Sequence, residues 1–92
     1  PAGFVELQGS FFEQRREEIL NLVKNEEKLE KGEHPLERIM QVRPADGHIL
    51  ITTTGVHLAR RIGDAVVRAY QGDLTCTYGD DEKTVRVKWL SR

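Results

Sequence analysis

The sequence has little cysteine and no long apolar run. With Cys76 alone, no intrachain disulfide can form, so a hydrophobic core rather than cross-links must hold the fold together. No segment approaches the roughly 18 consecutive apolar residues of a membrane span, and no charged-then-apolar leader resembles a secretion signal. We therefore expect a cytoplasmic protein with no membrane partner.

The sequence also lacks an excess of either charge. Its 14 lysines and arginines face 15 aspartates and glutamates, which gives a formal net charge of −1. Generic polyanion binders usually show a clear basic excess, so a nucleic-acid site here must come from local clustering. Ninety-two residues fit one domain, spanning 1–92. Because the first residue is Pro1 rather than methionine, we expect a fragment of a longer protein.

Catalytic motifs are absent as well. The sequence has no Gly-x-Ser-x-Gly elbow, Walker loop, Gly-x-Gly-x-x-Gly or His-Glu-x-x-His. His34, His48, His57 and Cys76 are potential metal ligands, but none are paired at the close spacing of local zinc motifs. Strand alternation predicts that Cys76 is a buried, inert thiol. We expect no enzyme, no catalytic residue, no metal site and no cofactor in this fragment, although tertiary folding could still assemble a ligand set.

Hydrophobic periodicity predicts seven elements. They are a strand at 4–8, a helix beginning at 10–13, a hairpin at 38–53, a second helix with an apolar arc over 58–69, and a terminal hairpin with a turn at 79–82. This order is typical of an α+β, ferredoxin-like β-α-β-β-α-β sandwich with an extra C-terminal edge strand. Right-handed crossovers would place both helices on one face of a mostly antiparallel sheet and leave the other face open.

Two local features of the helices are predicted. Ser10 and Glu13 have the spacing of a capping box. In this motif the serine hydroxyl accepts a hydrogen bond from an unpaired backbone amide of the first helical turn, and the glutamate carboxylate accepts one from the serine amide. Gly63 lies near Ala59 at the edge of the second apolar arc, and such a small-residue patch predicts a close approach of the two helices.

The start of the second helix is the best candidate for ligand contact. The threonine-rich strand end at 52–54 leads into a helix whose first amides and dipole favour an anion. Arginines one turn later add charge suited to a phosphate. The candidate residues are Thr54, Gly55, His57, Arg60, Arg61 and Arg68. In the alternative interpretation, Thr53 or Thr54 simply caps the helix and the arginines are solvated.

The open face of the sheet is the second candidate surface. Alternation predicts that it is polar and mildly basic, with Arg43, Thr52, Thr75, Thr77, Arg86 and Lys88. RNA-recognition motifs need aromatic residues on such a face for base stacking. Because Tyr78 and Trp89 are expected on the helix side, and no Gly-x-x-Gly loop of a KH module is present, we expect phosphate contacts through Arg86 and Lys88.

Several stretches resemble known proteins. From His34-Pro35-Leu36-Glu37-Arg38-Ile39 onward, including 52–54, 57–63 and 69–72, the chain resembles small uncharacterised bacterial zinc-ribbon proteins. That resemblance implies a cysteine-rich zinc ribbon, and hence zinc, in an absent N-terminal region. From Asp46-Gly47 through the second helix, the chain is more distantly similar to the archaeal and eukaryotic large-ribosomal-subunit export adaptor family. That similarity implies an association with the ribosome.

Two functions follow as expectations. The first is an accessory domain that binds RNA or the ribosome, contacting phosphates through a basic helix start. The alternative is a protein–protein interaction or dimerisation module that pairs through a sheet edge. A small enzyme or ligand binder is a third interpretation, which a closed polar cavity would favour.

Overall fold

The described part of the chain forms eight helices and strands. The computed structural model describes residues 2–79, 81 and 83–92. The elements are β1 (Gly3–Gln8), α1 (Ser10–Gln14), α2 (Arg16–Glu30), β2 (Ile39–Ala45), β3 (His48–Thr53), α3 (Val56–Tyr70), β4 (Asp73–Tyr78) and β5 (Val85–Leu90). Asp80 and Glu82, which belong to the turn predicted at 79–82, lie outside the described residues. Within those ranges, no helix has both the length and the apolar character needed to cross a membrane.

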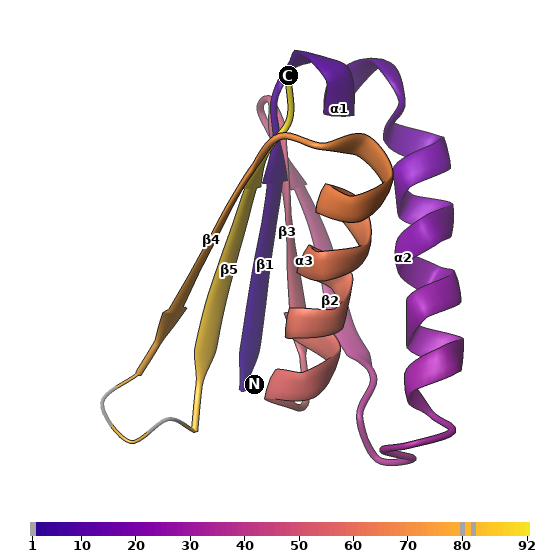
Figure 1. The fold of residues 1–92 in the computed structure, drawn as a ribbon, viewed down its shortest axis with the longest axis vertical. Helices are drawn as coiled ribbons and strands as arrows, with labels where there is room; N and C mark the ends of the chain where they lie inside the picture. The colour runs from indigo at the N-terminus through magenta and orange to yellow at the C-terminus, as the bar shows by residue number, and fades with distance from the viewer. Residues whose placement is uncertain (1, 80, 82) are drawn as a thin grey trace.

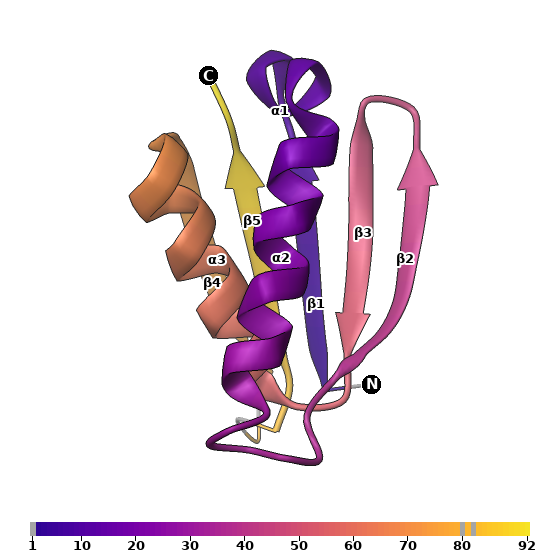
Figure 2. The same cartoon turned by 90° about the vertical axis from the view of Figure 1, so that its right-hand side faces the viewer.

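The strands form one sheet in the order β2-β3-β1-β5-β4. The β1–β5 pair is parallel, and the β1–β3, β2–β3 and β4–β5 pairs are antiparallel. Helices α2 and α3 lie side by side against the same face of this sheet (Figures 1 and 2). The predicted α+β class, with helices on one face of a mostly antiparallel sheet, is therefore confirmed.

The prediction that the C-terminal strand lies at an edge is wrong. Strand β5 is inserted between β1 and β4, parallel to β1, with Val87 opposite Val5 and Trp89 opposite Leu7. Its inward side chains Val85, Val87 and Trp89 are buried, whereas β4 is largely exposed. A strand with a fully apolar inner face buries most apolar surface when it has neighbours on both sides and a helix above it. Strand β5 therefore lies in the interior of the sheet, and β4 lies at its edge.

The first predicted helix is two helices, α1 and α2, which meet at Arg15, where the backbone leaves helical geometry (φ −120°, ψ 27°). The capping box predicted at Ser10 is also wrong. The Ser10 hydroxyl donates to the carbonyl of Arg92 (3.1 Å), and Ser91 Oγ accepts from the Phe12 amide (2.9 Å). The C-terminal residues therefore satisfy the first turn of α1, which couples this helix to the end of β5.

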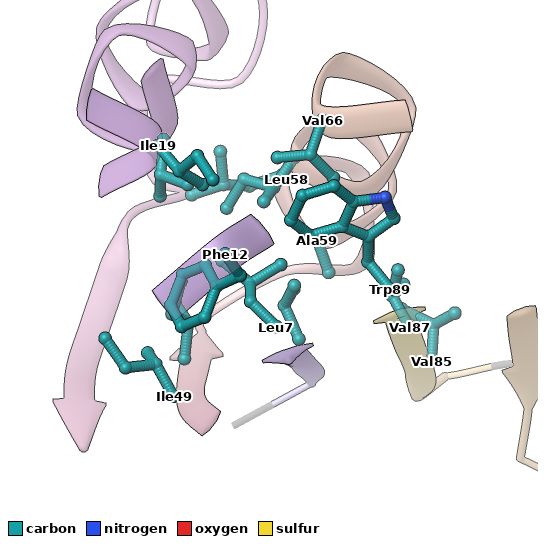
Figure 3. Packing of buried hydrophobic residues seen from close by; sticks show 14 residues of the cluster. Leu7, Phe12, Ile19, Ile49, Leu58, Ala59, Val66, Val85, Val87 and Trp89 are labelled. Atoms are coloured by element: carbon teal, nitrogen blue, oxygen red, sulfur yellow. The ribbon is translucent and has the colours of Figure 1, made fainter. Parts of the chain in front are cut away.

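The hydrophobic core lies between the sheet and the helices. Figure 3 shows Phe12 and Leu7 packed together, with Trp89 beneath Val66 of α3. Trp89 and Phe12 are the largest fully buried side chains. The Trp89 indole Nε1–H donates to the Gln71 carbonyl (2.7 Å), which satisfies the polar atom of this ring.

Gly63 brings α3 close to the sheet rather than to α2. A Cβ atom at this position would lie 2.6 Å from Val87 Cγ1 and 3.2 Å from Leu74 Cδ1. The predicted role in helix–helix approach is therefore wrong. The glycine instead lets α3 pack directly over the β5–β4 pair, because any side chain would meet the buried Val87.

Replacing Gly63 with alanine should destabilise the protein. Alanine improves helix propensity by about 1 kcal/mol, but overpacking against Val87 costs about 1–3 kcal/mol, so we expect a net loss in the free energy of urea unfolding. The control is Gly32→Ala, whose Cβ would meet no atom closer than 3.4 Å. Equal stability of Gly63→Ala and wild type would contradict the close α3–β5 approach.

Candidate functional site

The start of α3 is occupied by a carboxylate of the chain itself. Glu37 Oε1 accepts from the Leu58 amide (2.8 Å), and its Oε2 lies 2.7 Å from His57 Nδ1. Gly55 makes this possible, because a side chain there would collide with the Glu37 carboxyl group. Glu37 thus caps the helix and compensates its dipole. The place where the sequence predicted a phosphate is already filled by an anion.

The threonines before α3 hold the preceding loop. Thr54 Oγ1 accepts from the Arg38 amide (2.9 Å) and donates to the Leu36 carbonyl (3.1 Å). Thr53 Oγ1 donates to the Gly55 carbonyl (2.7 Å). Neither threonine caps α3, so that alternative interpretation is wrong as well. The bonds of Thr54 attach the segment 36–38 to the end of β3, which brings Glu37 to the helix.

Arg61 joins α3 to α2 through carboxylates. Its guanidinium lies 2.9 Å from Glu26 Oε1, 3.1 Å from Glu30 Oε2 and 3.8 Å from Glu33 Oε2. Burial alone would raise the pKa of Glu30, but hydrogen bonds from His34 and Arg61 lower it below the ordinary value. Hydrogen bonds to Glu26 and Glu30 raise the pKa of Arg61. The positive charge of Arg61 is therefore neutralised by carboxylates of the same chain.

Two histidines far apart in the sequence meet beside this cluster. The rings of His34 and His57 stack with centroids 4.1 Å apart and planes 7° from parallel. His34 Nδ1 lies 2.5 Å from Glu30 Oε1, just as His57 Nδ1 contacts Glu37. No sequence spacing signals this pair, because it depends on the fold of the segment 31–38 against α3.

A groove of about 520 Å³ runs beside the histidines. Its lining comes from α2, the following loop, α3 and β4: Glu26, Glu30, Glu33, His34, Val56, His57, Arg60, Arg61, Asp64, Ala65, Arg68 and Tyr78. Arg60 donates to the Tyr78 hydroxyl, and its guanidinium lies 5.8 Å from the Tyr78 ring centroid. The groove mixes both charges and is open to solvent, so it is not the closed polar cavity that would favour a small enzyme.

The opposite face of the sheet carries an aromatic ring that the sequence interpretation missed. Phe4 lies on β1 between Thr52 of β3 and Arg86 of β5, and the Arg86 guanidinium is 4.8 Å from its ring centroid. Lys88 is 4.0 Å from Glu6 on the same strand pair. The sequence contains the pattern that predicts this position, because Val5 and Leu7 alternate inward and therefore place Phe4 on the outward side.

Strand β4 corrects one prediction and confirms another. Cys76 is exposed rather than buried. In register it faces the helix side opposite Val87, but β4 is the outermost strand and α3 packs mainly over β5 and β1. Tyr78 and Trp89 are on the helix side as predicted, since Tyr78 contacts Arg60 and Trp89 is buried.

The predicted site residues do not form one site. Thr54, Gly55, His57, Arg60, Arg61 and Arg68 belong to the start or flank of α3, on the helix side of the sheet. Arg86 and Lys88 alternate with buried residues of β5 and therefore lie on the opposite face. The protein thus offers two separate polar surfaces, the helix-side groove and the open sheet face.

Comparison with protein-family models, curated proteins and solved structures found no match to the chain. The resemblance to zinc-ribbon proteins and to the ribosomal export adaptor family therefore stays a prediction. A functional assignment depends on the geometry of the two surfaces.

The lowered pKa of Glu30 predicts a pH-dependent contribution to stability. Because the folded-state pKa lies below the unfolded value of about 4.5, this contribution is present above that pH and is lost as the pH falls through the folded pKa. In Glu30→Gln, the stability deficit relative to wild type should stay constant from about pH 7 to about pH 4.5 and shrink as the pH falls further. Urea unfolding at a series of pH values measures it.

The matched control is Asp46→Asn, which removes an exposed carboxylate at the β2–β3 turn. The difference in the free energy of unfolding between Asp46→Asn and wild type should not change with pH in the way expected for Glu30→Gln. A Glu30→Gln deficit that stays constant across the whole pH range would contradict the assigned role of this carboxylate.

Proposed function

We propose that the domain binds single-stranded RNA through the open face of its sheet, with Phe4 as the stacking platform. The observation that carries the proposal is the Phe4–Arg86 pair on neighbouring interior strands, with 4.8 Å between the guanidinium and the ring centroid. Aromatic rings and arginine planes on a sheet surface are the groups on which RNA-binding domains stack unpaired bases.

The surroundings of Phe4 suit a nucleic-acid strand. Strand register places hydroxyl and basic side chains on the same face: Arg43, Thr52, Thr75, Thr77, Arg86 and Lys88. Threonine hydroxyls can hydrogen-bond to bases and to the ribose 2′-OH, and the basic groups can contact phosphates. Since Glu6 already pairs with Lys88, we expect few phosphate contacts and a shallow salt dependence.

The helix side is a weaker candidate for this role. Glu37 occupies the start of α3, and Arg61 is paired with carboxylates of α2 and the following loop. We therefore assign the RNA contacts to Phe4, Arg86 and Arg43 rather than to Arg60 and Arg61. An accessory domain of this kind, acting on ribosomal or other RNA in the cytoplasm, agrees with the family resemblance.

Phe4→Leu tests the proposal, because leucine keeps the apolar bulk and removes the aromatic face. Stacking contributes about 1–3 kcal/mol per base, so we expect a labelled single-stranded RNA to bind about 5- to 150-fold more weakly in fluorescence anisotropy. Arg86→Ala should also weaken binding. Lys28→Ala on α2 is the charge control. If Phe4→Leu bound RNA with wild-type affinity, the assignment of the binding site to Phe4 would be wrong. Stronger binding of duplex than of single-stranded RNA would contradict the stacking mechanism.

The edge strand β2 favours a second candidate function, self-association. Met40 and Val42 are 54% and 40% exposed, and an apolar groove of about 330 Å³ runs between β2 and α2, lined by Leu20, Val23, Lys24, Glu27, Ile39 and Val42. Figure 2 shows β2 at the outer edge of the sheet, next to β3. An exposed edge with apolar side chains is a template for pairing with the same strand of a second copy.

Val42→Lys should abolish such pairing, because a charged side chain would replace an apolar one within the groove. We expect wild type to sediment as a dimer at high concentration and Val42→Lys as a monomer. Leu36→Lys is the control, since Leu36 is 88% exposed and lies outside β2. A strictly monomeric wild type at high concentration would eliminate this second candidate.

A further inference from the structure

We propose that His34, Glu37 and His57 form a binding site for a divalent transition metal of the zinc class. One donor atom from each of the three side chains lies within 4.8 Å of the others. The site is on the helix side of the sheet and does not depend on the RNA-binding proposal.

The spacing needs only a small closure to hold an ion. Ligands about 2.0–2.2 Å from a tetrahedral zinc lie roughly 3.4 Å from each other, so the histidine donors need to approach Glu37 and each other by at most about 1.4 Å. His34 and His57 have side chains 39% and 60% exposed, which leaves them free to adjust. Glu37 is less exposed, at 13%, and is held by the Leu58 amide, so it forms the fixed part of the site.

His34 is already oriented by a carboxylate that is not itself a proposed ligand. Glu30 contacts Nδ1 of His34, which leaves Nε2 as the nitrogen available to an ion. Glu30 is itself 3% exposed and paired with Arg61, so its position is well determined. A carboxylate on the second ring nitrogen is the usual partner of a metal-binding histidine, because it sets the tautomer and the ring orientation.

The local charge favours a dication. Four carboxylates surround the histidines, those of Glu26, Glu30, Glu33 and Glu37, and the guanidinium of Arg61 pairs with the first three. Two imidazoles and a carboxylate suit zinc-class ions, whereas calcium and magnesium prefer oxygen donors alone. Three protein ligands leave a coordination position toward the groove for water or an anionic ligand.

The test titrates Zn²⁺ into the tag-free chain after chelator treatment, with a chromophoric chelator as competitor. We expect one ion per chain, and binding weakened at least about tenfold in His34→Gln and in His57→Gln, since even loss of a supporting contact costs 10–100-fold. Co²⁺ should give the visible absorption of a low-symmetry, tetrahedral-like site in wild type only. His48→Gln is the matched control, because His48 starts β3 and lies away from the cluster.

Each outcome decides the proposal. Loss of binding in both histidine variants, with His48→Gln equal to wild type and unchanged far-ultraviolet circular dichroism, supports the site. Absence of Zn²⁺ binding to wild type, or equal weakening in all three variants, overturns it. If His57→Gln unfolds, His34→Gln alone decides, because His34 is in the loop after α2 and does not cap a helix.

Discussion

The burial of the inner face of β5 is the constraint on which the rest of the structure depends. Val85, Val87 and Trp89 are all buried under α3, and this places the last strand in the interior beside β1. Three consequences follow. Strand β4 becomes an edge and exposes Cys76, α3 needs Gly63 to reach Val87, and the outward residue Arg86 comes to lie against Phe4. The open face that we propose for RNA therefore exists because the opposite face of the same strands is apolar.

A second layer of organisation is electrostatic and lies on the helix side. The segment after α2 folds back against α3, where Glu37 caps the helix and Arg61 ties its flank to Glu26 and Glu30. This network removes the anion site that a basic helix start would otherwise offer. It also brings His34 against His57, so the same contacts that exclude a phosphate create a cluster suited to a cation.

The two surfaces differ in how well they could be predicted. Strict alternation in β1 and β5 specifies which side chains share a face, so the sheet surface with Arg86 and Lys88 follows from sequence. The same alternation also places the aromatic ring of Phe4 on this surface, although Phe4 was not among the predicted residues. The histidine cluster has no comparable local pattern, because its members come from a loop and a helix joined by the hydrogen bonds of Thr54 and Glu37.

By itself the sequence determined the number and type of most elements, the side of the sheet that the helices cover and the alternation along each strand. These properties depend on periodicities of 2 and 3.6 residues, which are local. The tertiary structure decided the interior position of β5, the break at Arg15 and the occupant of the α3 start. Each of these accompanies a contact between distant segments, Val87 with Gly63, Ser91 with Phe12, and Glu37 with Leu58, whose free energy no local periodicity encodes.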